Sequence, residues 1–291
     1  YSFAPIGSIR YDPRLKSDEL EIPDKFVATD GRSAEVSASS YRDSHKAADK
    51  GASYDETYRQ TWESLLWSRE QHFLSNILDK YFPDQEIRLL DFACGTGRIA
   101  EFIEHRVSTS LGVDVSTSML ARAKPKLKRT ELIQADLTRG NVLQGRRFNL
   151  ITAFRFFLNA EPELRLEAIK ILSSLLTEDG CLIFNNHHNL GSPYWALANL
   201  RARARSGRGG GRVMSIRQMH ELARAADLEI VEIHPVGFAR LPRVTLPLWL
   251  NMRIETAAIR IKRLHSMFES LIAVARHRAP SNCRPSAKAS P

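Results

Sequence analysis

Residues 88–100 read Arg-Leu-Leu-Asp-Phe-Ala-Cys-Gly-Thr-Gly-Arg-Ile-Ala, and the rest of the chain is organised around this stretch. Its apolar residues at 89–92 predict a short buried strand, and a helix is expected to follow the second glycine. Gly95 and Gly97 predict a tight turn between the two. Because glycine has no Cβ, the backbone there can approach a bound molecule closely. The N–H groups at the start of the helix favour an anion. The stretch therefore predicts a ligand-binding turn.

The two glycines alone leave three interpretations open. Residues 95–100, Gly-Thr-Gly-Arg-Ile-Ala, fit the dinucleotide-binding pattern G-x-G-x-x-G/A. Residues 91–97 also resemble the first motif of the class I S-adenosylmethionine-dependent methyltransferases, acidic-x-x-x-Gly-x-Gly, with Asp91 as the acid. A turn that binds nothing is the third interpretation. Residues further along the chain must decide between them.

A second carboxylate follows the glycine motif at a spacing that is typical of an acid that binds a ribose. Residues 111–116, Leu-Gly-Val-Asp-Val-Ser, predict a strand that ends near Asp114. An acid about 20 positions after the glycine motif can accept hydrogen bonds from both ribose hydroxyls, in either family. Ser116 is suited to cap a helix over 119–124. Residues 114–120 closely resemble the methyltransferase segment in which the residues after the acid pack beside adenine.

A third acidic residue distinguishes the methyltransferase interpretation from the dinucleotide-binding one. A strand predicted at 131–134 leads into Ala135, Asp136 and Leu137. In the methyltransferases that this segment resembles, the Asp accepts a hydrogen bond from the exocyclic amine of adenine, and the next backbone N–H donates to the ring. A dinucleotide-binding domain does not require an acid at this place. The combined context favours the methyltransferase interpretation.

The remaining pattern predicts an α/β protein. Ser215 and Gln218 form a capping box that opens a helix, and Gly180 is expected to cap the end of another. The further strands are expected at 148–154, 181–185, 228–236 and 269–275, and the further helices at 54–82 and 162–176. The resemblance implies a doubly wound, seven-stranded, mostly parallel sheet with an antiparallel last strand.

The expected domain organisation has a single catalytic domain with extensions. Tyr54, Tyr58 and Trp62 belong either to a lid over the site or to the ordinary core. The predicted parts are an irregular, partly disordered arm at 1–50, a helical lid or cap at 51–84, a methyltransferase domain at 85–278 with an insertion at 241–267 before the last strand, and a disordered tail at 279–291.

The charge balance favours anionic partners. The chain has 42 Lys and Arg against 33 Asp and Glu, a formal charge of +9. Residues 201–213 predict a mobile Arg- and Gly-rich loop that either binds phosphates or is simply solvated. The insertion 241–267, with Trp249 beside leucines and arginines, predicts either a peripheral membrane contact or a helix packed on its own domain. Nucleic acid is not favoured, because no appended RNA-binding module is recognisable.

The cysteines indicate neither a metal site nor a disulfide framework. Cys94, Cys181 and Cys283 lack metal-ligand spacing, so no metal is expected. A reducing cytoplasm fits this usage best, with a peripheral membrane location as the alternative. No apolar run reaches the ~20 residues that a membrane-spanning helix needs.

The resemblance implies S-adenosylmethionine as the cofactor and S-adenosylhomocysteine as its product, bound at the carboxyl ends of the strands. The cofactor contacts are expected from residues of the three motifs and the fourth strand, namely Asp91, Ala93, Gly95, Gly97, Asp114, Val115, Met119, Asp136, Leu137 and Phe154.

The methyl acceptor is predicted only by class. Arg155, at the end of the fourth strand, could hold an anionic group, with Asn159 beside it. His187 and His188 follow the fifth strand as candidate bases or as bystanders. The Asn/Asp-Pro-Pro-aromatic motif of amine-directed methyltransferases is absent. We therefore expect an O-methyltransferase acting on a small, sugar-linked or lipid-linked acceptor. N-methylation, an RNA methyltransferase and a non-catalytic S-adenosylmethionine-binding protein are the alternatives.

Overall fold

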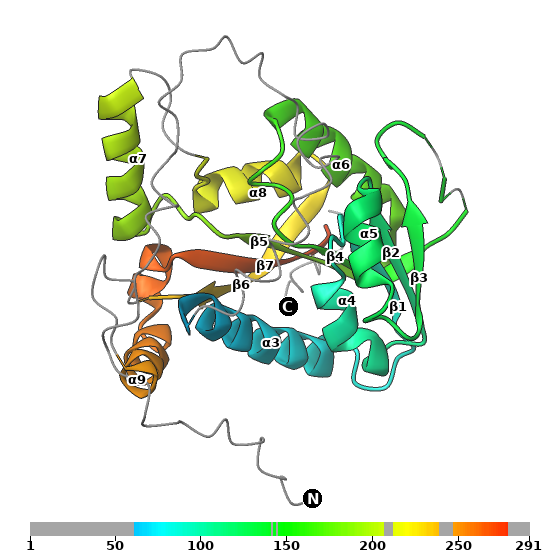
Figure 1. Ribbon diagram of the computed structural model, residues 1–291, viewed down its shortest axis with the longest axis horizontal. Coiled ribbons are helices and arrows are strands. Elements are labelled where there is room, and N and C mark those ends of the chain that lie inside the picture. The colour runs from blue at the N-terminus through cyan, green and yellow to red at the C-terminus, as the bar shows by residue number, and fades with distance from the viewer. Residues whose placement is uncertain (1–60, 141, 144, 207–211, 239–246, 279–291) are drawn as a thin grey trace, which may run out of the picture. The chain divides into compact units, whose positions relative to one another are not determined.

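The computed structural model describes residues 61–140, 142–143, 145–206, 212–238 and 247–278. Within these ranges, seven strands form one sheet in the order β3-β2-β1-β4-β5-β7-β6 (Figure 1). The strands are β1 Arg88–Phe92, β2 Thr109–Asp114, β3 Thr130–Gln134, β4 Phe148–Ala153, β5 Leu176–Asn186, β6 Leu228–Val236 and β7 Ser270–His277. The pairs from β3 to β5 are parallel, and β7 is antiparallel to both β5 and β6. This confirms the predicted fold class.

Helices lie in most of the connections between the strands. The α-helices are α3 Thr61–Tyr81, α4 Arg98–Ile103, α5 Thr117–Ala123, α6 Pro162–Leu175, α7 Pro193–Ser206, α8 Ile216–Arg224 and α9 Leu248–Ile259, with short 3-10 turns at η2 Glu104–Arg106 and η3 Lys262–Met267. The two predicted N-terminal caps are confirmed. The Ser116 side chain accepts a hydrogen bond from the Met119 N–H, and Ser215 and Gln218 form a complete capping box.

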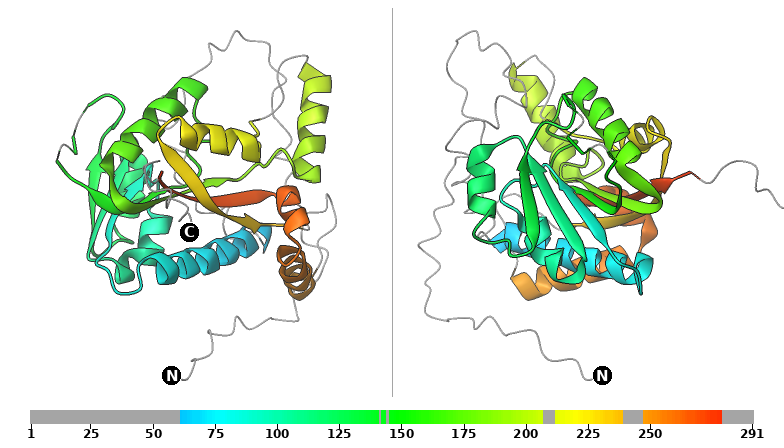
Figure 2. Two further views of the ribbon diagram at one scale, coloured as in Figure 1. Left: turned by 180° about the vertical axis from the view of Figure 1, so that it is seen from behind. Right: turned by 90° about the vertical axis from the view of Figure 1, so that its right-hand side faces the viewer.

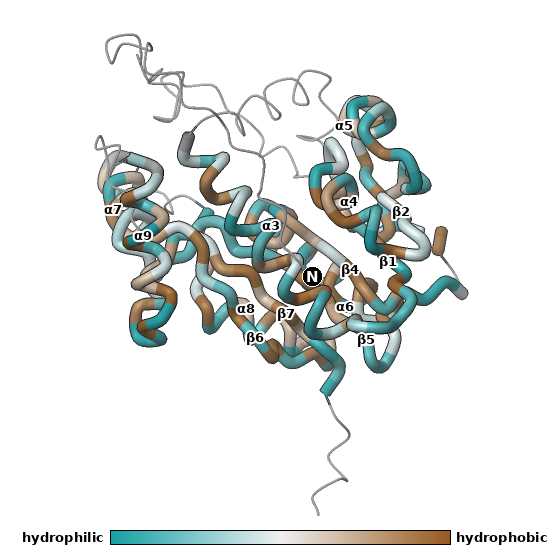
Figure 3. Tube along the Cα trace, turned by 90° about the horizontal axis from the view of Figure 1, so that it is seen from below, coloured by the Kyte–Doolittle hydropathy of each residue, from teal (hydrophilic) through white to brown (hydrophobic). Residues whose placement is uncertain are grey.

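Helices cover both faces of the sheet. α3 and α4 lie on one side, and α6 and α8 lie on the other (Figures 1 and 2). Leu74 of α3 belongs to one buried cluster with Ile183 of β5, and Leu172 of α6 belongs to a second cluster with Leu182. Adjacent β5 residues therefore face opposite cores, as strands covered on both sides require. Figure 3 shows the resulting apolar character of the central strands.

Two sequence-based boundaries are wrong for identifiable reasons. Gly180 does not cap a helix, because α6 ends at Leu175 and the chain continues directly into β5. A Cβ at position 180 would lie 2.7 Å from Leu176 Cδ1 and 3.0 Å from the Asn149 carbonyl oxygen, so the glycine permits a close approach inside the sheet. Residues 201–206 belong to α7 rather than to a loop. Alanine and arginine alternate there, and both are strong helix formers.

Several predictions fall outside the described residues. These are the arm at 1–50, the aromatic residues Tyr54 and Tyr58, the glycines within 207–211, the start of the insertion at 241–246, and the tail at 279–291 with Cys283. The helix expected at 54–82 is confirmed over Thr61–Tyr81. The domain boundaries proposed from the sequence stay predictions.

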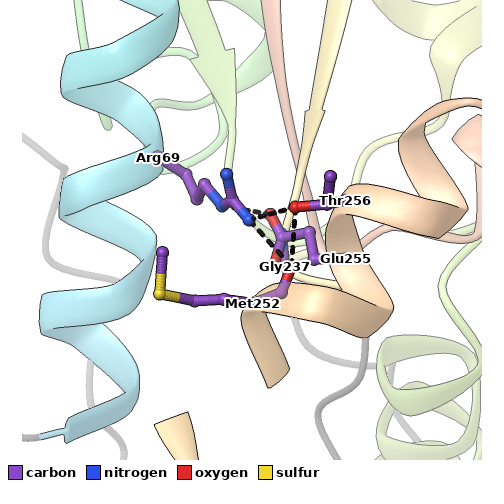
Figure 4. A network of polar contacts seen from close by, with 5 residues as sticks. All are labelled: Arg69, Gly237, Met252, Glu255 and Thr256. Carbon is purple, nitrogen blue, oxygen red and sulfur yellow. Dashed lines mark hydrogen bonds and ion pairs between the residues drawn. The ribbon is translucent and has the colours of Figure 1, made fainter. Parts of the chain in front are cut away.

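Helix α9, in the predicted insertion, is fastened to α3 through a polar network (Figure 4). The Arg69 guanidinium donates to the Met252 carbonyl at 3.1 Å and to the Thr256 hydroxyl at 3.0 Å, and its Nε lies 3.7 Å from Glu255 Oε1. The same Glu255 oxygen accepts a hydrogen bond from the Gly237 N–H at 3.1 Å. The described part of the insertion therefore packs on its own domain. Membrane contact through Trp249, which is 61% exposed, stays a prediction.

The loop after β5 is clamped to the segment that enters β7. Asn189 is buried, and its Nδ2 donates to the carbonyls of Ser266 at 2.7 Å and Phe268 at 2.9 Å. Its backbone N–H donates to the Glu269 carbonyl at 2.9 Å. Two residues on, a Cβ added to Gly191 would lie only 2.3 Å from the Ser266 carbonyl oxygen. The clamp therefore requires glycine at position 191.

We expect Gly191→Ala to destabilise the fold by about 1–3 kcal/mol, the usual cost of overpacking. The methyl group must push the Ser266 backbone away and strain the Asn189 hydrogen bonds. Urea unfolding followed by circular dichroism measures the loss. Gly140→Ala is the matched control, because a Cβ added at position 140 would have nothing within 4 Å of it. Equal stability of the two variants would contradict the clamp.

Candidate functional site

The turn after β1 is hydrogen-bonded to the end of β2. Ala93, Gly95 and Gly97 have φ values of 53°, 56° and 78°, in the left-handed region that favours glycine. The Gly95 N–H donates to Asp114 Oδ2 at 2.8 Å. The glycine motif and the second acid, which are 19 positions apart in the sequence, are therefore in direct contact.

Asp114 closes β2 with its carboxylate held from two sides. Its side chain is buried, and its Oδ1 accepts a hydrogen bond from the Ser116 N–H at 2.8 Å, while Oδ2 accepts from Gly95. Each carboxylate oxygen carries more than one lone pair and can accept a further hydrogen bond. The two backbone donors thus fix the orientation of the Asp114 carboxylate. A hydroxyl group of a ligand can donate a hydrogen bond to it.

A pocket of about 440 Å³ opens beside this carboxylate. Five residues predicted from the sequence line it: Ala93, Asp114, Val115, Asp136 and Leu137. The sequence analysis did not assign the other lining residues, Phe92, Val113, Ala135, Thr138, Phe156 and Leu164. A mostly apolar wall with two carboxylates suits a ligand that has a flat apolar part and several hydroxyl or amine donors.

Asp136 is oriented by the residues that follow it. Its Oδ1 accepts hydrogen bonds from the Thr138 N–H at 3.0 Å and the Thr138 hydroxyl at 2.5 Å. Its Oδ2 lies 3.7 Å from Arg139 Nε. Such a local turn, in which an Asp side chain bonds the backbone two residues on, holds the carboxylate in one position on the pocket wall.

Other predicted contact residues lie away from the pocket lining. A Cβ at Gly97 would lie 2.9 Å from Leu127 Cδ1, so this glycine is explained by packing between helices. Met119 is buried at 5% exposure. Phe154 packs in the cluster under α3, on the opposite face of the sheet from Phe156. Regular strand alternation would put both side chains on one face, but β4 ends at Ala153 and the chain turns at Arg155, whose φ is 58°, so Phe156, and not Phe154, lines the pocket.

Asp91 is fully buried beneath the turn with one unsatisfied oxygen. Its Oδ1 accepts from the Thr152 hydroxyl at 2.7 Å, while Oδ2 has no hydrogen-bond partner in the described part of the chain. Burial raises the pKa of Asp91 from 3.8 to about 7, against the lowering effect of the Thr152 hydrogen bond. The Ala100 backbone N–H and the Arg98 charge also lower this pKa, so the ionised form is partly stabilised despite its burial.

The raised pKa of Asp91 makes a prediction about stability. Between about pH 4 and pH 7 the folded protein binds a proton that the unfolded chain has lost, so the free energy of unfolding should fall as the pH rises through this window. Asn cannot ionise, so over this pH window we expect the free energy of unfolding of Asp91→Asn to fall by a few kcal/mol less than that of the wild type. Urea titrations at a series of pH values measure it. Parallel pH profiles for the variant and the wild type would contradict it.

A second polar group lies where β4 and β5 end. Arg155 follows β4 with a φ of 58°, and its N–H donates to Asn185 Oδ1 at 2.6 Å. Asn159 donates to the Arg155 carbonyl at 2.6 Å, which holds the turn from the other side. The Arg155 guanidinium forms an ion pair with Glu63 of α3 at 3.6 Å, and Arg155 is not among the residues that line the described pocket. Its contact with the methyl acceptor stays a prediction.

The two histidines after β5 have different surroundings. The ring of His188 stacks on Trp195 of α7 at 3.6 Å between centroids, and its Nδ1 lies 3.1 Å from the Arg212 carbonyl oxygen. His187 Nδ1 is buried without a hydrogen-bond partner in the described ranges. Burial and the nearby Arg155 guanidinium hold the pKa of His187 well below its usual value. His188 is engaged with α7, which leaves His187 as the histidine facing the polar group.

Two carboxylates on α3 were missed by the sequence analysis. Glu63 forms an ion pair with Arg155 at 3.6 Å, and Glu70 forms a hydrogen-bonded ion pair with Arg98 at 2.9 Å. The Arg98 guanidinium also lies 4.1 Å from the centre of the Trp67 ring. Glu70 interrupts the apolar stripe that includes Leu66 and Leu74, and this was a usable signal. A charged residue inside such a stripe is rarely buried unless it is paired.

The described ranges contain no group of three or more His, Cys, Asp or Glu side chains that could hold a metal ion. Over the same ranges, every helix lacks either the length or the apolar content that spanning a bilayer demands.

Comparison with known protein sequences identifies a domain in the centre of the chain. Residues 89–180 match a family model described as a methyltransferase domain. A curated protein of Geobacillus sp. (strain WCH70), which carries a provisional methyltransferase name, is 34% identical over 125 residues, or 40% of this chain and 49% of that protein. The chain thus spans about half the length of the curated relative that it matches.

Solved structures share the fold at low sequence identity. An S-adenosylmethionine-dependent methyltransferase of Clostridium acetobutylicum ATCC 824 has a TM-score of 0.54 and 16% identity, covering 78% of this chain and 99% of that chain. Magnesium protoporphyrin IX methyltransferase of Synechocystis PCC 6803, with bound S-adenosylhomocysteine, has a TM-score of 0.54 and 14% identity, covering 81% and 97%. At these identities the likeness establishes the fold alone.

Proposed function

We propose that this chain, whose residues 89–180 form a methyltransferase domain in the class I S-adenosylmethionine-dependent methyltransferase fold, transfers a methyl group from S-adenosylmethionine to an oxygen atom. The acceptor is a small molecule, free or linked to a sugar or a lipid. The observation that carries the proposal is the contact of the Gly95 N–H with Asp114 at the border of the pocket. It joins the two motifs that grip the methionine part and the ribose in the family that the sequence resembles.

The residues present fit this cofactor. Asp114 is held by two backbone N–H groups with its oxygens able to accept ribose hydroxyls. Asp136 and Leu137 lie on the same pocket wall and suit the adenine amine and ring. The unsatisfied Asp91 Oδ2 suits the positive charge that the cofactor carries. Each of these assignments is a proposal for its residue.

The bound cofactor supplies an electrophilic methyl group on its sulfonium. The chain must orient the acceptor oxygen and exclude water, and such positioning can supply about 7–11 kcal/mol of the barrier reduction. Arg155 and Asn185, hydrogen-bonded to each other where β4 and β5 end, are our candidates for orienting that acceptor. His187 is the candidate group for accepting a proton from an uncharged hydroxyl acceptor.

Calorimetry and a transfer assay test the proposal together. We expect S-adenosylhomocysteine to bind the purified chain, and NAD and NADP to give no heat. Tritiated S-adenosylmethionine is then incubated with fractions of a cell extract, and label is followed into small molecules, lipids and RNA. Absence of S-adenosylhomocysteine binding would overturn the proposal. Binding without transfer would leave a non-catalytic S-adenosylmethionine-binding protein, and label in RNA would redirect the acceptor.

A further inference from the structure

Two polar atoms at the end of β5 are buried without partners. Asn185 is 1% exposed, and while its Oδ1 accepts from the Arg155 N–H, its Nδ2 has no acceptor in the described part of the chain. His187 Nδ1 is buried and unpartnered in the same way. Leaving a buried donor unsatisfied costs about 1–3 kcal/mol. Asn185 is hydrogen-bonded to the Arg155 backbone, and the Arg155 charge acts on His187, so a ligand that accepts hydrogen bonds beside Arg155 would satisfy both atoms.

The charge around these atoms favours an anionic ligand. Arg155 and Arg98 both act on His187 through their positive charges. Arg98 is held by a hydrogen-bonded pair with Glu70 at 2.9 Å. The distance from Arg155 to Glu63 is 3.6 Å, longer than the 2.7–2.9 Å or so of a charge-assisted hydrogen bond. A side-chain carboxylate of α3 therefore already faces Arg155, which shows that this guanidinium is placed to pair with a carboxylate.

We propose that Arg155, Asn185 and His187 bind the carboxylate group of the methyl acceptor, and that the reaction forms a methyl ester. This inference rests on the proposed function. A planar guanidinium binds both oxygens of a carboxylate, and an amide N–H donor adds a third hydrogen bond. Because β1, β2, β4 and β5 are parallel, Arg155 and Asn185 lie at the same edge of the sheet as Asp114, and the bound carboxylate would lie at that edge.

The chemistry of a carboxylate suits the groups that are present. A lone pair of one carboxylate oxygen forms the new O–CH₃ bond, and the S–CH₃ bond breaks with its electron pair remaining on sulfur. No proton leaves, because the acceptor is already ionised. An uncharged hydroxyl would instead need a base. The pKa of His187 is held well below its usual value, which makes its imidazole a weak proton acceptor.

The test compares acids and alcohols of the same carbon skeleton on the protein saturated with S-adenosylhomocysteine. Benzoate is paired with benzyl alcohol, and octanoate with octanol, and binding is measured by calorimetry and by the unfolding midpoint. We expect each acid that binds to do so at least about tenfold more tightly than its alcohol, as one charge-assisted contact predicts. Arg155→Gln should abolish this preference, and Arg155→Lys should keep part of it. Arg217→Ala, on exposed α8, should match the wild type.

A chemical readout of the product is independent of these probes. Label transferred from tritiated S-adenosylmethionine to an extract is treated with mild alkali, which releases methanol from methyl esters but not from ethers or methylamines. Volatile label supports the inference, and alkali-stable label overturns it. Equal binding of acids and alcohols, or no response in either assay from a protein that binds S-adenosylhomocysteine, also overturns it. Loss of S-adenosylhomocysteine binding itself would instead refute the proposed function.

Discussion

Asp114→Ala weakens the binding of S-adenosylhomocysteine by at least about a hundredfold in titration calorimetry, and this is the largest effect on binding that we expect. A hydrogen bond to a charged group is worth about 1.5–3 kcal/mol, and two ribose hydroxyls would share this carboxylate. Tenfold in affinity corresponds to about 1.4 kcal/mol, so two such bonds account for a hundredfold or more. The side chain is also the partner of the Gly95 N–H, so its loss loosens the glycine turn as well.

Two further variants separate binding from folding. Asp114→Asn keeps an oxygen acceptor of the same shape, and we expect an intermediate loss. Ser116→Ala removes the cap that the Ser116 hydroxyl provides to the Met119 N–H but leaves the Asp114 carboxylate in place. It should lower stability slightly and bind nearly as the wild type does. A folded Asp114→Ala protein with unchanged affinity would show that the ribose lies elsewhere.

Local signals predicted much of the fold because they act over a few residues. Ser116 caps α5, and Ser215 with Gln218 opens α8, each through hydrogen bonds within four residues. Gly180 shows the limit of such signals. A glycine after an apolar helical run usually ends the helix. Here a contact between Gly180 and the Asn149 carbonyl decides its conformation, and that contact joins residues 31 positions apart, which no local pattern shows.

The sequence predicted the site residues that belong to motifs with a fixed spacing. It did not predict which of two nearby side chains faces the ligand. Asp114, Asp136 and Ala93 line the pocket as expected. Phe154 and Phe156 are both aromatic and both follow a strand that is buried on two sides, so apolar character does not tell which one faces the ligand. Glu63 was missed because its role depends on how α3 docks against Arg155, a contact across 92 positions of the chain.

A buried carboxylate contributes to that docking. Glu255 is 1% exposed, and it bridges α3 and the residue after β6 by contacting Arg69 at 3.7 Å and the Gly237 N–H at 3.1 Å (Figure 4). Burial raises the pKa of Glu255, while the Gly237 hydrogen bond and the Arg69 charge lower it. The carboxylate therefore depends on these two partners for its solvation. Arg69 in turn depends on Glu255 as its buried anion, since the Arg69 side chain is itself mostly buried.

We expect Glu255→Ala to lower the free energy of unfolding by about 3–5 kcal/mol, the range found when one partner of a buried ion pair is removed. The Gly237 N–H loses its acceptor, the Arg69 Nε loses its anion, and a cavity remains between α3 and α9. Glu255→Gln should cost less, because its amide oxygen can still accept from Gly237. Urea unfolding followed by circular dichroism gives the three values.

An exposed carboxylate provides the comparison that makes this result specific. Glu221 pairs with Arg217 at 2.8 Å on the surface of α8, with 52% of its side chain exposed. Its replacement by alanine should change stability by no more than about 1 kcal/mol. If Glu255→Ala is equally mild, the Glu255 network adds little to the packing of α3. If it is severe, the same network that fastens α9 also sets the position from which Glu63 and Glu70 face the two arginines at the site.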